Sequence, residues 1–183
     1  MDAVSAEAVA AKPTSKDDSF HIAFCVDNNY FRAMGATITS IIANNPGVHF
    51  TFHVLTFAAS DEHRRRLQEL EKKFNVRTCL HVLNTGDFKQ FDHFIKFSYY
   101  SLSIFTRLVI PSILKGVTDR VLYLDADILC VGKLDELVRM DISNDIAVVV
   151  PDAPVTTRRR VAALGLKHPQ YFNGGVLFIN VDK

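Results

Sequence analysis

The stretch that decides the fold is DRVLYLDADILCVGKLDEL, residues 119–137. Within it, the apolar run Val121–Leu124 is followed directly by Asp125, Ala126 and Asp127. An apolar run of this length, bounded by polar residues, predicts a buried strand. Two carboxylates placed this close repel each other unless a cation or a proton lies between them. The sequence therefore puts an acidic pair at the end of a buried strand, and that pair needs a partner.

Strand and helix patterns alternate on both sides of this segment. Strands are predicted at residues 21–27, 48–56, 76–83, 120–125, 145–152 and 174–182. Helices are predicted at residues 30–45, after Ser60 as N-cap, and at residues 103–114, where Pro111 kinks or splits the helix. Strands that alternate with helices of about 10–15 residues predict an α/β domain on a mainly parallel sheet, flanked by helices.

The length of 183 residues argues for one domain. We expect residues 1–19 to form a flexible tail and residues 20–183 to form the folded domain. The tail lacks the basic and then apolar layout of a signal peptide. No apolar run approaches the roughly 18–20 residues that a membrane span needs.

Charge and cysteine usage exclude several classes of protein. The net charge of +1 gives no strong field that would attract nucleic acid. The three cysteines, Cys25, Cys79 and Cys130, lie in apolar runs without a CxxC pair, so we expect buried thiols and a reducing compartment. The clusters Arg64–Arg66 and Arg158–Arg160 are interpreted as solvated surface, with contact to phosphate or lipid headgroups as the alternative.

Polar clusters lie at three predicted strand ends. Asp27–Tyr30 follow the first strand, Asp125–Asp127 follow the fourth, and Tyr171–Gly175 precede the last. In open α/β sheets, ligands bind outside the carboxyl ends of the strands. We therefore expect the three clusters to line one crevice.

The acidic pair suits a hard divalent cation. Residues i and i+2 of an extended chain point the same way, so Asp125 and Asp127 can share a ligand. Carboxylates together with waters and phosphate oxygens suit Mg²⁺ or Mn²⁺. Such a cation would neutralise a diphosphate leaving group, and the small Ala126 would let a substrate approach the backbone.

Two other interpretations of the pair stay open. One is a polar strand end that simply faces water. The other is a phosphatase of the haloacid dehalogenase class, in which the first Asp is a covalent nucleophile and the second a general acid. That class usually has Thr or Val where this chain has Leu129, and it places this strand first, whereas three predicted strands precede it here. The phosphatase therefore ranks below the metal site.

Four collinear motifs carry a family resemblance: AFCVDNNY (residues 23–30), FTRLVIP (105–111), VLYLDADILCVGKLDEL (121–137) and YFNGGVLFINVDK (171–183). From about His21 to Lys183 the chain resembles family 8 glycosyltransferases, most closely the bacterial lipopolysaccharide glucosyl- and galactosyltransferases. The resemblance implies a GT-A type fold. It also implies transfer of glucose or galactose from a UDP-sugar to a lipopolysaccharide core or similar glycan, with retention at the anomeric carbon.

The resemblance also assigns the site. Asp125 and Asp127 match the family's metal pair, with Mn²⁺ or Mg²⁺ as the cation. Asp27 and Asn29 would bind base and ribose, and Tyr30 would stack on uracil. The residues expected to bind the nucleotide sugar are Cys25, Val26, Asp27, Asn28, Asn29, Tyr30, Arg107 beside the diphosphate, Asp125, Ala126, and Asn173 and Gly174 beside the sugar. No residue matches a catalytic base or nucleophile.

Each matched cluster has an alternative that needs no ligand. Asp27–Asn29 would then cap the first helix. Arg107 would pair with a surface acid. Asn173–Gly175 would form an ordinary turn.

The chain also departs from the family pattern. A later family segment supplies a histidine metal ligand and further donor contacts, and nothing up to Lys183 corresponds to it. We therefore expect a GT-A domain that is incomplete at its C-terminus, with weak metal binding and little transfer activity in isolation. The non-catalytic alternative is an inactive nucleotide-binding fragment or interaction module. The family also implies a cytoplasmic location with peripheral contact at the inner membrane.

Overall fold

The computed structural model describes residues 6–8, 18–96 and 101–183. Most of the predicted tail lies outside these ranges. Residues 6–8 of that tail form a short strand, β1 (Ala6–Ala8), which pairs with β4 and was not predicted.

The other strands follow the predicted order. They are β2 (Phe20–Cys25), β3 (Phe50–Thr56), β4 (Arg77–Leu83), β5 (Arg120–Leu124), β6 (Ala147–Pro151) and β7 (Phe172–Asn180). The helices are α1 (Phe31–Asn44), α2 (Asp61–Phe74), α3 (Asp92–Ile95), α4 (Ile110–Leu114), α5 (Asp135–Arg139) and α6 (Pro154–Leu164), with 3₁₀ helices η1 (Thr85–Phe91) and η2 (Leu102–Val109).

The strands form one mixed sheet in the order β1-β4-β3-β2-β5-β7-β6. The central strands β4, β3, β2 and β5 are parallel, as predicted for an α/β fold. β7 is antiparallel to both β5 and β6. Because β7 runs opposite to β5, the start of β7 lies beside the end of β5, and this brings two of the predicted polar clusters together.

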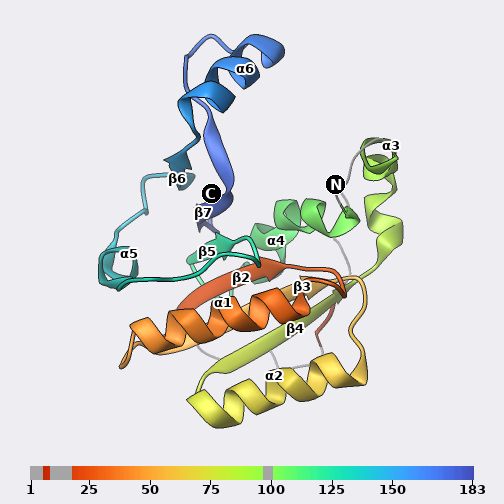
Figure 1. Cartoon of the computed structure of the whole chain (residues 1–183), viewed down its shortest axis with the longest axis vertical. Helices are drawn as coiled ribbons and strands as arrows, with labels where there is room; N and C mark the ends of the chain where they lie inside the picture. Colours follow the sequence, from red (N-terminus) through yellow and green to blue (C-terminus); the bar gives the residue numbers. More distant parts are fainter. Residues whose placement is uncertain (1–5, 9–17, 97–100) are drawn as a thin grey trace.

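Helices cover both faces of the sheet (Figure 1). On one face, α1 and α2 bury Met34, Ile38, Ile41 and Leu67 against β2, β3 and β4. On the other face, the segment from η1 to α4 packs Phe88 and Ile110 against the sheet. Burial on both faces explains why the central strands are almost continuously apolar.

Two helix predictions had different outcomes. The α2 prediction is confirmed, because the Ser60 side chain accepts a hydrogen bond from the His63 amide and forms a capping box. The segment 103–114, predicted as a helix that Pro111 kinks or splits, is split: its first part is the 3₁₀ helix η2, and the short α4 follows with Pro111 in its first turn. Proline lacks an amide hydrogen and clashes with the preceding turn, so a continuous α-helix through this position is disfavoured.

A row of three buried histidines crosses the parallel strands. His21 Nδ1 lies 2.9 Å from His53 Nε2, and His53 Nδ1 lies 3.1 Å from His81 Nε2. The His21 and His53 rings are stacked, with centroids 5.2 Å apart. The row is a hydrogen-bonded ladder that sequence analysis did not predict.

The cysteine prediction is met in part. All three cysteines are free thiols, but only Cys79 is buried, and Cys25 and Cys130 are partly exposed. Arg65 and Arg66 are exposed and pair with Glu62, and Arg158–Arg160 are exposed on α6. α6 projects away from the sheet and has no buried residue (Figure 1). Within the described ranges, none of the helices combines the length and apolar character required to traverse a bilayer.

Candidate functional site

The site is built where β5 ends and β7 begins. The Asp125 amide donates to the Gly175 carbonyl at 2.8 Å, which continues the β5–β7 ladder by one residue. Arg107, at the end of η2, donates through Nη1 to the Gly174 carbonyl at 2.5 Å. Three segments that are distant in sequence, represented by Arg107, Asp125 and Gly174, therefore meet at one point.

One oxygen of the Asp125 carboxylate is held by two donors. Its Oδ1 accepts from the Tyr123 hydroxyl at 2.6 Å and from Arg107 Nη2 at 3.3 Å. The Arg107 guanidinium lies over the Tyr123 ring, 4.6 Å from its centroid, and Arg107 Nε donates to the Ile104 carbonyl. Arg107 does pair with an acid, as one alternative supposed, but its partner is the site carboxylate and its side chain is only 18% exposed.

The two glycines permit this close approach. A Cβ added to Gly175 would lie 2.6 Å from Asp125 Oδ2, a separation that real side chains do not tolerate. A Cβ added to Gly174 would lie 3.3 Å from Arg107 Nη1. Asn173 Oδ1 accepts from the Gly175 amide at 2.7 Å. Residues 173–175 lie in the first half of β7, so they are not the ordinary turn offered as an alternative.

The loop after β5 is pinned to α1. The hydroxyl of Thr37 lies 2.7 Å from the Ala126 carbonyl oxygen and 2.6 Å from that of Ile128. Ala126 is 5% exposed and belongs to the core. Its small side chain thus lets the loop pack against α1, and its burial does not support the expected opening toward a substrate. Asp127 is exposed.

The acidic pair supplies oxygen donors that fit a hard cation. Asp125 Oδ2 packs against Gly175, and the Asp125 side chain is 42% exposed. Asp127 is exposed and is separated from Asp125 by the buried Ala126. Among the described residues, no group of three or more His, Cys, Asp and Glu side chains gathers as a ligand set. Two carboxylates would fill only part of the coordination sphere of a cation. Waters and phosphate oxygens would complete it, as is common for Mg²⁺ in proteins.

The predicted uridine segment runs from the end of β2 into α1. Asp27 Oδ1 accepts from the Asn29 amide at 2.9 Å, and the Tyr30 amide donates to the Asp27 carbonyl. The N-cap of α1 is Tyr30, with no side-chain cap, so the alternative that Asp27–Asn29 cap this helix is wrong. Asn28, Asn29 and Tyr30 are exposed, and the Tyr30 side chain is free to contact a ligand.

The Cys25 thiol and the Tyr123 hydroxyl, which lie behind this segment, both resist ionisation. Desolvation raises the pKa of the Cys25 thiol to about 12, although Thr106 and the positive charge of Arg107 oppose this shift. Desolvation is also the main reason that the pKa of Tyr123 is raised, and Asp125 adds to it. Both groups therefore stay protonated at neutral pH. Cys25 is not a nucleophile here, and Tyr123 remains a hydrogen-bond donor.

Sequence analysis missed Tyr123 as a site residue, and it placed Gly175 only in the cluster expected to line the crevice. Tyr123 is two residues before Asp125 on an extended strand, so both side chains lie on the same face. That spacing could have identified Tyr123. Gly175 is adjacent to a predicted residue, but the carboxylate that it accommodates comes from a strand about 50 residues earlier in the sequence, which no local pattern reveals.

Comparison with known proteins gives a consistent result. The profile of glycosyl transferase family 8 matches residues 21–183. The chain is 33% identical over 172 residues to the lipopolysaccharide 1,3-galactosyltransferase of Salmonella typhimurium, covering 91% of this chain and 50% of the relative. It is 28% identical over 168 residues to the lipopolysaccharide 1,2-glucosyltransferase of Escherichia coli, covering 91% and 49%.

A solved structure of the galactosyltransferase LgtC, in complex with donor and acceptor sugar analogs, is similar in fold. Its TM-score is 0.75 at 27% identity, over 90% of this chain and 59% of that one. The expected GT-A-like α/β fold is thereby confirmed. The chain spans about half the length of the curated relatives it matches.

Proposed function

The chain belongs to glycosyl transferase family 8, and on that premise we propose that it transfers glucose or galactose from a UDP-sugar to a lipopolysaccharide core or similar glycan. The observation that carries the proposal is the junction of Arg107, Asp125 and Gly174. There the Arg107 guanidinium contacts both the Asp125 carboxylate and the backbone carbonyl of Gly174 in β7. The named relatives include a galactosyl- and a glucosyltransferase, which supports a hexose donor. The proposed location is the cytoplasmic face of the inner membrane.

The proposed donor site begins at residues 27–30. The exposed Tyr30 ring offers a flat surface on which uracil stacks. The side-chain amide of Asn29, which is exposed, donates hydrogen bonds to the base and ribose and accepts hydrogen bonds from them. The Asp27 carboxylate accepts from the Asn29 backbone amide and so fixes the turn that precedes Tyr30.

The proposed diphosphate site lies at the β5–β7 junction. A divalent cation held by Asp125 and Asp127, Mn²⁺ or Mg²⁺, would supply neutralisation of the diphosphate charge. Arg107 adds a permanent positive charge. Its guanidinium is held in place by the hydrogen bond to the Gly174 carbonyl and by the contact with the Tyr123 ring. The donor sugar is placed beside Asn173, which is exposed, and Gly174, whose carbonyl accepts from Arg107.

The proposed reaction retains configuration at the anomeric carbon. The bond from the anomeric carbon to the phosphate oxygen breaks, and the bond to the acceptor hydroxyl oxygen forms on the same face of the sugar. The acceptor proton passes to a phosphate oxygen of the departing UDP. Arg107 stabilises the charge that develops on the leaving group. No side chain is assigned as nucleophile, because Asp125 is committed to Tyr123 and Arg107.

Binding is the appropriate test, because the chain spans about half the length of its relatives. UDP is titrated calorimetrically against the chain with and without Mn²⁺. We expect binding that Mn²⁺ strengthens, and we expect Asp125→Asn to abolish the Mn²⁺-dependent part. Failure to bind any uridine nucleotide would overturn the proposal in favour of an interaction module. Release of phosphate from generic phosphomonoesters would instead favour the phosphatase.

A further inference from the structure

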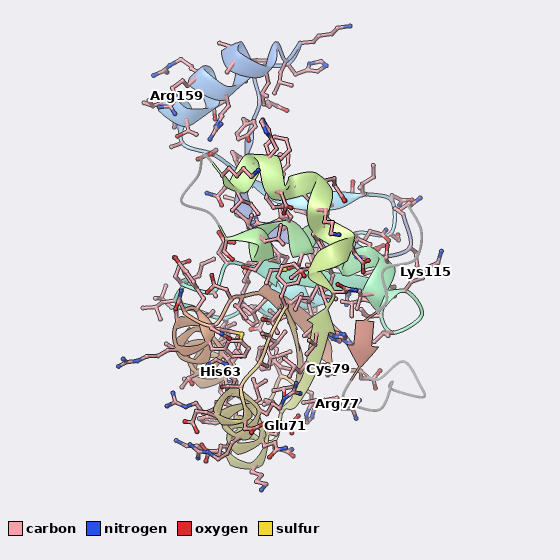
Figure 2. All side chains as sticks on the ribbon, turned by 90° about the vertical axis from the view of Figure 1, so that its right-hand side faces the viewer. His63, Glu71, Arg77, Cys79, Lys115 and Arg159 are labelled. Carbon is pink, nitrogen blue, oxygen red and sulfur yellow. The ribbon has the colours of Figure 1, made fainter. Side chains whose placement is uncertain are left out.

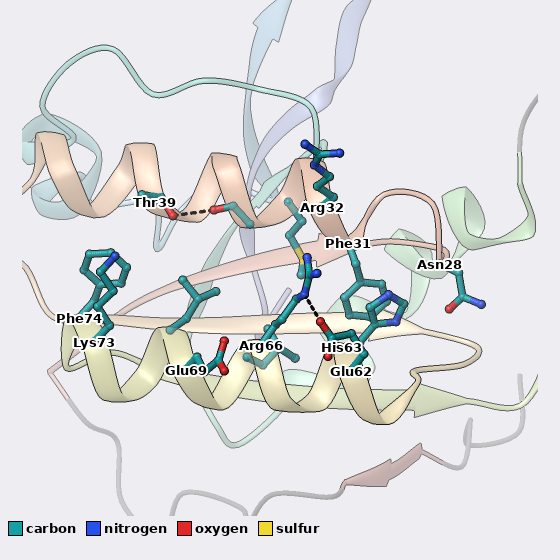
Figure 3. Close-up of a pocket in the computed structure, with 14 residues that line it drawn as sticks. Asn28, Phe31, Arg32, Thr39, Glu62, His63, Arg66, Glu69, Lys73 and Phe74 are labelled. Atoms are coloured by element: carbon teal, nitrogen blue, oxygen red, sulfur yellow. Dashed lines mark hydrogen bonds and ion pairs between the residues drawn. The ribbon is translucent and has the colours of Figure 1, made fainter.

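A separate cavity of about 520 Å³ lies between α1 and α2 (Figure 3). Both helices contribute to its walls, and Asn28 is the one residue that it shares with the predicted nucleotide site. Its volume falls within the range of roughly 300–1,000 Å³ that is typical of small-molecule sites. Nothing in the proposed glycosyl transfer uses this cavity.

The floor of the cavity is apolar and open. Met34 and Leu67 form its buried base, and Leu70 and Phe74 continue it along α2. A Cβ added to Gly35, in the α1 wall, would meet no atom within 4 Å. The cavity is therefore a continuous apolar trough with free space beside α1.

One end of the trough is positively charged. Figure 3 shows Asn28, Arg32, Glu62 and His63 toward the end at which both helices begin, with Arg66 further along α2. Arg32 is exposed and has no acidic partner among residues 6–8, 18–96 and 101–183. The N-terminus of α1 adds to this charge, because α1 has no side-chain cap and no acidic residue in its first turn.

The acids near this end are already neutralised. Glu62 accepts from Arg65 through one oxygen and from Arg66 Nε through the other, at 2.6 Å each. These hydrogen bonds lower the pKa of Glu62, so it stays ionised within the pairs. Glu69 pairs with Arg65. Arg66 uses only Nε in its pair with Glu62, which leaves its terminal amino groups for another acceptor.

The opposite end of the trough differs in chemistry. There Lys73 Nζ lies over the Phe74 ring, 5.0 Å from its centroid (Figure 3). At the charged end, the Phe31 and His63 rings stack with centroids 3.9 Å apart and form a wall. The trough thus has two arginines with unused hydrogen-bond donors toward one end, and an apolar floor that continues between Thr39 on α1 and Glu69 and Lys73 on α2.

From this polarity we propose that the trough binds a single-chain amphiphile with a phosphate head. The head is held by Arg32 and the terminal amino groups of Arg66, whose planar forks match phosphate oxygens. The alkyl chain lies along Met34, Gly35 and Leu67 toward Phe74, where burial of its methylene groups favours binding. The proposal is independent of the proposed glycosyl transfer.

The test uses dodecyl phosphate, titrated calorimetrically below its micelle concentration. We expect saturable binding with one site per chain, and much weaker binding of inorganic phosphate or of uncharged dodecanol. Arg32→Gln should weaken binding of dodecyl phosphate by about tenfold, the effect of one charge-assisted hydrogen bond. Its matched control, Lys73→Gln at the other end, should leave the affinity nearly unchanged.

Gly35→Leu tests the apolar part of the trough. The new side chain should fill the free space and block dodecyl phosphate, while the melting temperature stays the same or rises, because leucine favours a helix more than glycine does. Ala36→Leu, on the exposed side of α1, is the matched control and should bind normally. If Gly35→Leu does not fold, Leu70→Gln at the floor should weaken binding instead.

Three outcomes would overturn the proposal. The first is binding that appears only above the micelle concentration, which would indicate a general surface effect. The second is equal loss of affinity in Arg32→Gln and Lys73→Gln, which would indicate nonspecific attraction. The third is unchanged binding in a folded Gly35→Leu or Leu70→Gln variant.

Discussion

The Tyr123 hydroxyl donates a 2.6 Å hydrogen bond to Asp125 Oδ1, from a side chain that is only 1% exposed. Arg107 donates to the same oxygen and lies over the Tyr123 ring. The orientation of the carboxylate is therefore set by buried neighbours before any ligand binds. Its second oxygen, Oδ2, packs against Gly175, where an added Cβ would lie 2.6 Å away, and the Asp125 side chain as a whole is 42% exposed.

The first prediction concerns the Tyr123 hydroxyl. In Tyr123→Phe the ring still packs under Arg107, but Asp125 loses its shorter hydrogen bond. We expect Mn²⁺-dependent UDP binding to weaken by about three- to tenfold, and the free energy of unfolding to fall by about 1 kcal/mol. Calorimetric titration and urea denaturation measure the two effects.

The control for this prediction is Thr156→Val, which removes the hydroxyl of a half-buried residue on α6 that is not part of the Asp125 contacts. It should change neither quantity. If Tyr123→Phe lowers UDP binding equally with and without Mn²⁺, Tyr123 does not act by orienting Asp125.

The second prediction concerns the space beside Asp125. In Gly175→Ala the new methyl group would lie 2.6 Å from Asp125 Oδ2, so the carboxylate must rotate or the strands must separate. We expect loss of Mn²⁺-dependent UDP binding, measured by titration, in a chain that remains folded by circular dichroism. Gly132→Ala is the control, since a Cβ there meets no atom within 4 Å. Normal binding by Gly175→Ala would show that the position of Oδ2 does not matter.

The third prediction concerns the guanidinium of Arg107. Lysine keeps the positive charge but cannot contact Gly174, Asp125 and Ile104 at once, because it lacks the planar fork. We expect Arg107→Lys to weaken UDP binding by about tenfold and to lower the free energy of unfolding by about 1–3 kcal/mol. Arg159→Lys on the exposed face of α6 should leave both unchanged. Wild-type affinity in Arg107→Lys would show that charge alone suffices.

Some of these features were predicted from the sequence and others were not. The apolar run before Asp125 and the alternation of strands and helices predicted the parallel centre of the sheet, because burial on both faces leaves a strong local pattern. The direction of β7 was not predicted, since a period-two pattern is the same in either direction. Yet that antiparallel direction places Gly174 and Gly175 against Arg107 and Asp125.

Side-chain partners were harder to predict than strand ends. Arg107 was predicted through its motif, but its contacts with Tyr123 and Gly174 depend on packing between segments far apart in sequence. The histidine ladder was missed for the same reason. Each histidine lies in a separate apolar strand, and only the register of β2, β3 and β4 aligns them.

The fourth prediction concerns this ladder and pH. Burial lowers the pKa of His81 from 6.5 to about 4, and burial with the neighbouring histidines lowers the pKa of His53 well below 6.5. The folded state therefore binds fewer protons than the unfolded state between these pH values. The stability that the neutral ladder contributes is fully present above about pH 6.5 and is lost as the pH falls toward 4.

The part of this loss that His81 contributes follows from its pKa shift. At 1.36 kcal/mol per pKa unit, its depression from 6.5 to about 4 corresponds to roughly 3 kcal/mol at acidic pH. Urea denaturation at a series of pH values from 8 to 4.5 measures the effect. We expect His81→Gln to flatten the profile below pH 6.5, and His168→Gln, at an exposed position, to leave it as in the wild type. A profile that is flat in the wild type would show that the buried histidines do not resist protonation.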